Sequence, residues 1–324
     1  MITRRAITGG LLAAPFVSRL AFAQATTLSV NSALAADDPL FKGLEAFKAG
    51  VEGRSNGRIT VRLFPSSQLG SDEDVLEQAR AGAGVAIVVD GARIAPFAKE
   101  FGILGAPYVA NGFEELRKIT TSPLFDQWTE RLRRASGHQV LSFNWFQGQR
   151  HLLTNKPVQR PADLAGVRLR TPGAPVWLET VRAMGATPTP LPWTEVYSAL
   201  QLKAIDAAEA QLPAIWGSRL YEVAKVITKT GHINLITGLI GSRGWFDALP
   251  QDLRAIVREE ALKGGDIGSQ ATIASLDGFE AKMKSQGVAI NDVDVTPFKE
   301  ATRTVYDKLG YSELRAEVDK VIKS

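Results

Sequence analysis

The stretch GVRLRTPGAP, residues 166–175, sets two arginines two positions apart in a short predicted strand that ends at a Pro/Gly turn. Residues two apart in a strand share a face, so Arg168 and Arg170 point away from Val167 and Leu169. Ligands of open α/β sheets meet the carboxyl ends of strands, and Arg170 stands at that end. We expect Arg168 to be solvated or ion-paired. For Arg170 two roles remain open: a buried structural ion pair, or a planar fork that binds a ligand anion.

Strands and helices alternate on both sides of this stretch. Downstream, the pattern predicts a helix over 175–185, a strand over 187–191, a helix over 193–201 and a strand over 204–211. Upstream, it predicts strands over 26–34, 58–65, 85–91 and 138–146, with helices over 41–51 and from the capping-box residue Ser71 onward. Such alternation is typical of wound α/β units. We therefore predict two α/β units, the second beginning near residue 148, with a cleft between them.

The chain becomes mostly helical from Leu249 onward. A single helix over 250–286 would exceed about 50 Å at roughly 1.5 Å per residue, which is enough to brace both units. Gly264, Gly265 and Gly268 favour a kink in that helix.

Chain length and net charge limit the classes to which the protein can belong. With 324 residues, 45% of them hydrophobic, the chain is globular and long enough for about two domains. Its net charge is +4, but Arg4, Arg5 and Arg19 lie in a segment that we expect to be removed. Without those three the 38 basic residues become 35, against 34 acidic ones. A nucleic-acid partner is therefore not expected.

The first 25 residues have the pattern of an export signal. A basic start, MITRR, precedes the apolar run AITGGLLAAPFVS, and Ala21 and Ala23 form a small-residue cleavage pattern before Gln24. The paired arginines favour the twin-arginine route over the general secretory route, which stays open. The sequence has no cysteine, so it forms no disulfide, and we predict a protein of the periplasm that is cleaved near Ala23.

Signatures of catalysis are missing from the sequence. It contains no G-x-S-x-G elbow, no H-E-x-x-H and no G-x-x-x-x-G-K-[ST] loop. The glycines of GAGVAI, residues 82–87, follow a helix and precede a strand, so they are read as a helix end and not as a dinucleotide turn. An exported enzyme using Asp206 and Glu209 as an acid/base pair is the competing class. We predict no enzyme, no cofactor and no resident metal.

From about Trp145 to His232 the sequence resembles the solute receptors of tripartite ATP-independent periplasmic (TRAP) transporters. The resemblance rests on GQRHLLTNKPVQRPADLAGVRLRTPGAPV, GATPTPLPWTEVYSALQLKAIDAAEA and LYEVAKVITKTGH, and weaker likeness extends over most of the chain beyond the signal. It implies two α/β domains joined by hinge strands, with a long helix across both, closing as a clamshell on an organic acid. It also implies delivery of that acid to an integral-membrane TRAP permease. An ABC-type receptor, which shares the clamshell, is the other transport alternative.

The resemblance also implies which residues bind. The arginine at the end of the K-x-R-x-P strand, here Arg170, pairs with the ligand carboxylate in that family, and an arginine of a G-x-R turn, here Arg150, faces the ligand in many members. The aromatic residue before E-V-Y is here Trp193. Arg150 is left with two roles, as a second clamp or as a partner of Glu209.

Several positions depart from the family pattern. Gly173 and Ala210 stand where relatives have amide side chains, and Trp193 replaces Phe. These departures favour a ligand that is smaller or more apolar than sialic acid, such as a partly apolar monocarboxylate, aromatic or hydroxylated. A C4-dicarboxylate or keto acid bridged by a cation is the alternative. Glu209 is then either a salt-bridge partner, which we favour, or a cation ligand together with Gln149.

Further candidates for the cleft are Asp90 and Asn31 at strand ends and the aromatic Trp145. The predicted division is residues 26–147 with about 235–275 in domain I, 148–234 with about 276–310 in domain II, and a C-terminal helix over 311–324.

Overall fold

The computed structural model describes residues 26–324, and the predicted export signal lies outside these residues. The described strands are β1 (Thr26–Asn31), β2 (Ile59–Phe64), β3 (Val85–Asp90), β4 (His138–Thr154), β5 (Arg168–Thr171), β6 (Thr187–Pro190), β7 (Ala207–Gln211), β8 (Val226–Ser242) and β9 (Ala289–Asp292). All of them belong to one mixed sheet.

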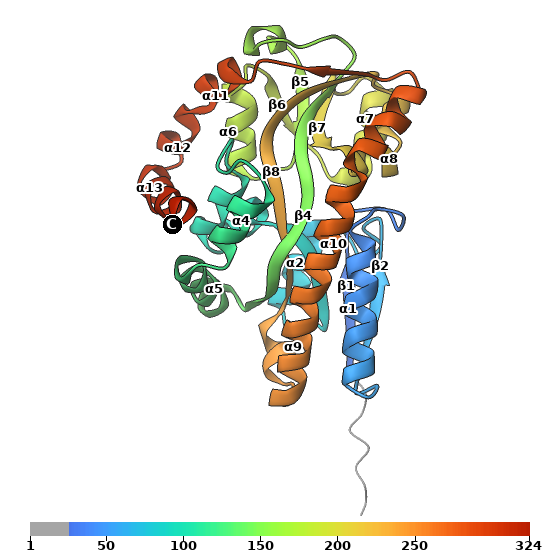
Figure 1. The fold of residues 1–324 in the computed structure, drawn as a ribbon, viewed down its shortest axis with the longest axis vertical. Helices are drawn as coiled ribbons and strands as arrows, with labels where there is room; N and C mark the ends of the chain where they lie inside the picture. The colour runs from blue at the N-terminus through green and yellow to red at the C-terminus, as the bar shows by residue number, and fades with distance from the viewer. Residues whose placement is uncertain (1–25) are drawn as a thin grey trace, which may run out of the picture.

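Helices cover this sheet and fill the connections between its strands (Figure 1). The first half contains α1 (Phe41–Arg54), α2 (Asp72–Arg80), α3 (Gly91–Ile94), the 3-10 helix η1 (Lys99–Gly105), α4 (Phe113–Thr120) and α5 (Pro123–Ser136). The second half contains η2 (Pro161–Leu164), α6 (Pro175–Ala183), η3 (Trp193–Glu195), α7 (Val196–Gln201), α8 (Leu212–Gly217), η4 (Leu220–Glu222) and α9 (Arg243–Asp247). The chain ends with α10 (Gln251–Ser285), α11 (Thr296–Thr302), α12 (Thr304–Lys308) and α13 (Ser312–Lys323).

Two long antiparallel strands join the two ends of the sheet. The strand order is β2-β1-β3-β8-β4-β7-β5-β6, and β9 pairs with the start of β8. At one end β1 is parallel to β2 and β3, and at the other β5 is parallel to β6 and β7. β4 and β8 have 17 residues each and run between the two parallel groups. The two predicted α/β units are therefore present, but their strands form one continuous sheet through β4 and β8.

Most predicted elements lie where the pattern placed them. The helix predicted from Ser71 is α2, and its capping box is formed, since the Ser71 and Asp74 side chains each accept from the other's backbone N–H. The strand predicted over 138–146 continues to Thr154, so it is nearly twice as long as expected. The domain boundaries predicted above stay a prediction.

The long helix α10 is unbroken over 35 residues, and the kink expected at its glycines stays a prediction. These glycines serve close packing. A Cβ on Gly264 would lie 2.7 Å from the backbone oxygen of Gly43 in α1, and a Cβ on Gly265 would overlap the Asn144 amide of β4. α10 thus lies directly against α1 and β4, and it also contacts α8 and β9 toward the other end of the sheet (Figure 1).

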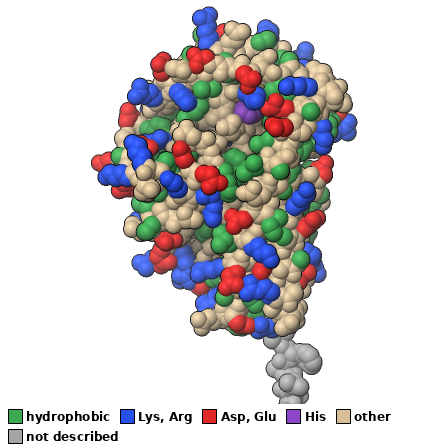
Figure 2. Space-filling model, viewed as in Figure 1, with side chains coloured by type: hydrophobic (Ala, Val, Ile, Leu, Met, Phe, Trp, Pro, Cys, Tyr) green, Lys and Arg blue, Asp and Glu red, His purple; other side chains and the backbone are tan. Residues whose placement is uncertain are grey.

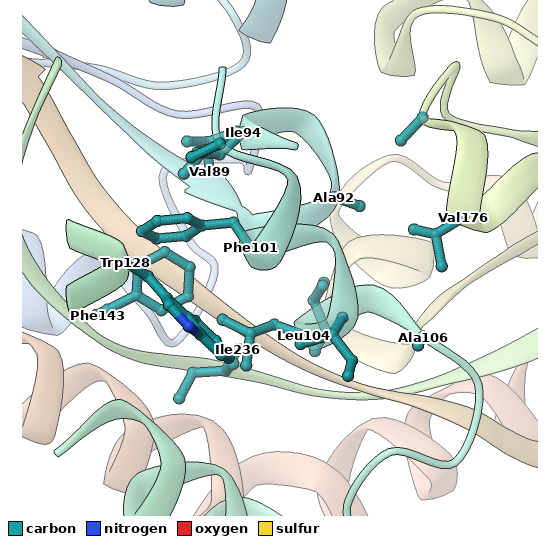
Figure 3. Packing of buried hydrophobic residues seen from close by; sticks show 14 of the residues in the cluster. Val89, Ala92, Ile94, Phe101, Leu104, Ala106, Trp128, Phe143, Val176 and Ile236 are labelled. Carbon is teal, nitrogen blue, oxygen red and sulfur yellow. The ribbon is translucent and has the colours of Figure 1, made fainter. Parts of the chain in front are cut away.

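The largest apolar cluster packs on one face of the first sheet half. Figure 3 shows Phe101, Trp128 and Phe143 gathered at one side of it and Val176 approaching from α6 at the other. Because α6 follows β5 of the other half, this core already spans both ends of the sheet.

The surface carries both signs of charge. Figure 2 shows Lys and Arg interspersed with Asp and Glu over the visible face, with no broad basic area. None of the helices within residues 26–324 is long and apolar enough to cross a membrane.

Candidate ligand-binding site

A cavity lies between the two ends of the sheet, beside the strands β4 and β8. Residues from both halves of the chain line it: Ser32, Ala33, Leu34, Asp72, Val88, Val89, Asp90, Arg93, Gln147, Arg150, Arg170, Pro172, Trp177, Trp193, Gln211, Ala214, Leu235 and Thr237. It therefore combines aromatic and aliphatic walls with three arginines and two aspartates.

Arg170 is the cation of this cavity that lacks a carboxylate partner. Its side chain is 1% exposed, and no carboxylate oxygen among the described residues lies within 4 Å of its nitrogens. Its Nε and one Nη donate to the Leu191 carbonyl at 3.0 and 2.6 Å, and its guanidinium lies 5.3 Å from the centre of the Trp193 ring. Burial and the neighbouring charge of Arg93 lower the pKa of Arg170 to about 9. The remaining N–H donors are held in a desolvated cation that an anion would stabilise.

Arg150 forms a buried ion pair with Glu209. Two of its nitrogens donate to the Glu209 carboxylate, one at 2.8 Å and the other through Nε, and a third donates to Gln211 at 3.2 Å. Thr171 also donates to Glu209, at 2.8 Å. Burial alone would raise the pKa of Glu209, but the Arg150 charge holds it at about 2. The structure contains the pairing of Arg150 with Glu209, and because Arg150 also lines the cavity its role as a second clamp stays a prediction.

A second arginine-carboxylate cluster lies across the cavity. Arg93, in α3, donates to Asp90 at the end of β3 and to Glu73 at 3.0 Å, and its Nε lies 3.4 Å from Asp72. Burial would lower the pKa of Arg93, yet these carboxylates raise it above its usual value. The Asp90 side chain also accepts from the Arg93 backbone N–H and so caps α3.

Trp177 and Trp193 form the aromatic walls. Trp177 of α6 is 1% exposed and lies near both Arg93 and Arg150, whose guanidinium carbons are 5.3 and 4.7 Å from its ring centre. Its indole N–H donates to the Gly105 carbonyl at 3.0 Å and so links α6 to η1.

The predicted site residues separate into two groups. Arg170, Arg150, Trp193 and Asp90 line the cavity, and Glu209 lies directly behind Arg150. Asn31, Trp145, Ala210 and Gln149 do not line it. The Asn31 amide bonds the backbone at 69 and 70, Trp145 is enclosed with its N–H on Ser142, and Ala210 packs in an apolar cluster.

The structure does not bring Gln149 to Glu209 in a shared site. Gln149 is exposed beside Gly231, whereas Glu209 is 1% exposed and committed to Arg150. Within residues 26–324 no group of three or more His, Cys, Asp or Glu side chains is arranged to hold a metal. Asp206, the other acid of the enzyme alternative, pairs with Arg168 at 2.9 Å on the surface.

Sequence reasoning missed Arg93, Asp72, Trp177, Gln147 and Gln211. Arg93 could have been predicted by the reasoning used for Arg170, because it follows the end of a strand by three residues. Asp72 and Trp177 were not, because the former was read only as part of a helix start and the latter as an ordinary apolar position of a helix.

A wider outer chamber of about 900 Å³, open to solvent, adjoins the cavity. It shares Ala33, Asp72, Arg93, Pro172 and Trp193 with the cavity and is otherwise lined by Ser67, Ser71, Glu73, Ala92, Pro96, Gly173, Ala174, Pro175, Pro190, Leu191, Pro192 and Thr194. Gly173 thus lies in this outer chamber and not beside Arg170.

A sheet crossed by two long strands, with a charged cavity between its two ends, defines a solute-binding protein of the clamshell class. Comparison with known proteins narrows the class. Residues 30–313 match the family described as bacterial extracellular solute-binding protein, family 7. The chain belongs to this family, and the resemblance to TRAP receptors is confirmed. The family is one of solute-binding transport proteins, so the prediction of a receptor instead of an exported enzyme is confirmed as well.

Three relatives illustrate the match. The sialic acid-binding periplasmic protein of Vibrio cholerae is 29% identical over 282 residues, covering 87% of this chain and 88% of its own. A TRAP solute-binding protein of Escherichia fergusonii, solved as an apo open structure, is 48% identical with a TM-score of 0.81, covering 92% and 100%. One from Ochrobacterium anthropi, solved with bound L-fuconate, is 31% identical with a TM-score of 0.89, covering 92% and 99%.

The two solved relatives differ in an informative way. Structural similarity ordinarily rises with sequence identity, yet the more identical chain, which is open, superimposes less well than the ligand-bound one. The arrangement described here is therefore more similar to that of the ligand-bound relative than to that of the open one.

Proposed function

We propose that the protein is a periplasmic receptor that binds an organic acid through a carboxylate–Arg170 pair and passes it to a TRAP-type membrane permease. The observation that carries the proposal is the buried guanidinium of Arg170, which lines the cavity and has no carboxylate partner among residues 26–324. A buried charge is costly unless it is paired, so a site that keeps one unpaired is suited to a ligand of opposite charge.

The guanidinium selects carboxylates by shape as well as charge. It offers a planar fork, and two parallel N–H donors match the two oxygens of a carboxylate. Relatives named above bind sialic acid and L-fuconate, both of which are carboxylic acids, and this supports the choice of ligand class.

Binding proceeds as closure of a clamshell. The acid docks on Arg170 of one half, and the other half, carrying Asp90 and Arg93, then covers it and excludes water from the new ion pair. A micromolar dissociation constant needs about 8 kcal/mol. Charge-assisted hydrogen bonds supply roughly 1.5–3 kcal/mol each, so burial against Trp177 and Trp193 must supply most of the remainder.

The ligand class is a small or partly apolar monocarboxylate, hydroxylated or aromatic. Arg150 is occupied by Glu209, so Arg170 is the free guanidinium of the cavity, which favours one carboxylate per ligand. A C4-dicarboxylate or keto acid held by a bridging cation is the second candidate, and we expect a chelator to abolish binding only in that case.

A thermal-shift screen of the chain from residue 26 onward tests the proposal. About a hundred organic acids would be tried, each with and without chelator, and a ligand at 100 times its dissociation constant adds about 2.7 kcal/mol of stability. Hits confined to carboxylates support the receptor. No shift with any acid, together with no carboxylate retained in native mass spectrometry of the purified chain, would refute it.

The clamp itself is tested by matched variants. Arg170→Lys keeps the charge and loses the fork, so affinity for the best acid should fall at least about thirtyfold, or about 2 kcal/mol. Arg168→Lys makes the same change on the same strand, at an exposed residue paired with Asp206, and should leave affinity unchanged. Isothermal calorimetry measures both. Normal binding by Arg170→Lys would exclude Arg170 as the clamp.

A TRAP receptor differs from an ABC-type receptor in the membrane permease to which it delivers the acid. Proteoliposomes that contain a TRAP permease and an imposed sodium or proton gradient, without ATP, should accumulate the acid only when this receptor is added. Uptake that requires ATP would contradict the TRAP assignment.

A further inference from the structure

Trp177 contacts both halves of the chain. It belongs to α6, the helix that follows the strand of Arg170, and its indole N–H donates to the Gly105 carbonyl of η1 at 3.0 Å. The centre of its ring lies 5.3 Å from the guanidinium carbon of Arg93 in α3. Because η1 and α3 belong to the first half of the chain and α6 to the second, both contacts cross between the halves.

The two ends of α6 pack in different cores. Near its C-terminus, Val181 lies in the apolar cluster of the second half that includes Leu169 of β5. At its N-terminus, Val176 and Trp177 lie in the cluster around Phe101, as Figure 3 shows for Val176. One end of α6 is therefore fixed to the second half, while the other end meets the first half.

The approach of α6 to η1 depends on a glycine at position 105. A Cβ on Gly105 would lie 2.6 Å from the Trp177 Nε1 and 2.9 Å from the Ala92 Cβ, so a larger residue would push the indole away. Trp177 is 1% exposed, and its bond to Gly105 is therefore shielded from water. Gly105 lies behind the cavity wall and is not one of the residues that line it.

Opening of the cavity would break these contacts. The two halves of the sheet are connected through β4 and β8, and a bend of this pair would part α6 from η1 and α3. The Trp177 N–H would then lose the Gly105 carbonyl, and its ring would lose Arg93. Contacts that exist in one of two arrangements shift the equilibrium toward that arrangement, so these contacts favour the closed one.

We infer that Trp177 is the latch of this receptor, a positioning residue that holds the two halves together over the bound acid and so sets the affinity. This rests on the proposed function, since the step that the latch stabilises is closure over an acid on Arg170. Trp177 follows Arg170 by seven residues in one strand–turn–helix segment. The segment that carries the clamp thus also carries the latch.

Trp177→Phe tests the hydrogen bond, because it keeps an aromatic wall and removes the N–H donor. Affinity for the best acid of the screen should fall about threefold to tenfold, mainly through faster dissociation. Trp145→Phe is the control, since the Trp145 N–H donates to Ser142 at 2.8 Å within β4 and crosses no division. Its affinity should stay within about twofold of the unmodified chain in calorimetry. Unchanged affinity in Trp177→Phe, or an equal loss in both variants, would overturn the inference.

A double-mutant cycle with Gly105→Ala separates the latch from direct contact with the ligand. In the unmodified chain the added methyl group meets the indole, so Gly105→Ala should weaken binding at least about tenfold. In Trp177→Phe, which lacks the indole nitrogen, the same change should weaken binding by no more than about threefold. The contact with Ala92 lies within the first half and is common to both backgrounds. An equal effect in both backgrounds would show that the indole does not act across the halves.

The latch should act on all acids alike, because it joins protein to protein. Gly105→Ala should weaken a small and a large acid from the screen by factors that agree within about twofold. A loss confined to one of them would overturn the latch. The proposed function fails separately: normal binding by Arg170→Lys would exclude the clamp, whereas the coupling between Trp177 and Gly105 would persist whichever residue holds the acid.

Discussion

At the scale of single residues, the site contains buried charged groups whose burial does not stabilise the fold. Arg170 is buried with two hydrogen bonds to one carbonyl as its polar contacts, and the acceptor oxygen of Asp72 is buried with none. Such residues lower the stability of the ligand-free protein, and a carboxylate bound to Arg170 recovers part of the lost free energy.

Replacing Arg170 should therefore separate stability from binding. Burial and the Arg93 charge lower the pKa of Arg170 to about 9 in the folded protein. At lower pH values the charged side chain therefore costs the folded state free energy relative to the unfolded state. Arg170→Gln keeps a donor for the Leu191 carbonyl and should raise the free energy of unfolding by about 1–3 kcal/mol, while carboxylate binding is lost. Chemical denaturation without ligand measures this. A less stable variant would mean that the guanidinium supports the fold.

Asp72 gives a prediction of pH dependence. Burial raises its pKa from 3.8 to about 6, so the folded chain holds a proton that the unfolded chain has released between these values. Stability from this group is present below about pH 4 and is lost as pH rises through 6. Asp72→Asn should thus stabilise the ligand-free protein by about 1–3 kcal/mol at pH 7.5 and by little at pH 4. An equal gain at both pH values would contradict the buried, titrating carboxylate.

The sequence allowed some of these residues to be predicted and hid others. The end of a parallel strand is a local signal, and it identified Arg170 and Asp90. The exposure of Asp72 to the cavity depends on Pro172 and Trp193, which approach from the opposite half of the chain. Asn31 also stands at a strand end, but its amide closes a turn at residues 69 and 70, a contact that spacing does not reveal.

At the scale of elements, helices with a polar face and short strands bounded by turn residues were predictable, including β3, which is buried on both faces. β8 was not recognised, because it has 17 residues, is buried for most of its length, and shows neither alternation nor the short length that marks a buried strand. The extension of β4 was hidden by register shifts along its pairing with β8. The glycines of α10 were identified as special, and the structure shows that Gly264, Gly265 and Gly268 allow close contact with neighbouring elements.

Two Gly→Ala substitutions in α10 should have opposite effects. At Gly264 a methyl group would lie 2.7 Å from the Gly43 backbone oxygen, so Gly264→Ala should lower the free energy of unfolding by about 1–3 kcal/mol. At Gly278 a Cβ meets nothing within 4 Å, so Gly278→Ala should raise it by about 0.5–1 kcal/mol. Thermal denaturation measures both. Similar changes in the two variants would refute close packing at Gly264.

At the scale of the whole molecule, the binding cavity exists because the two ends of the sheet are brought together. The core around Phe101 includes Val176 and Trp177 of α6, and the Trp177 indole reaches the Gly105 carbonyl across the division predicted from the sequence. β4 and β8 provide the only sheet connection described between the two parallel groups of strands, so bending of this pair would open the cavity.

Closure can be followed with labels, since the chain has no native cysteine. Glu73→Cys and Thr194→Cys place spin labels on exposed residues at opposite walls of the outer chamber. Pulsed electron resonance should give a long, broad distance distribution without ligand and a shorter, narrower one when the best acid is added. Identical distributions in both conditions would show that binding does not require closure.

The position of Trp177 between the two halves has a consequence for the fluorescence of the protein. Its indole ring lies within 5.3 Å of two guanidinium groups, one from α3 and one from β4, and its N–H donates to a carbonyl of η1. Any motion that parts the halves moves a cation away from an emitting ring and admits solvent to it. We therefore expect the ultraviolet emission of Trp177, one of six tryptophans in the chain, to change with occupancy without any added dye.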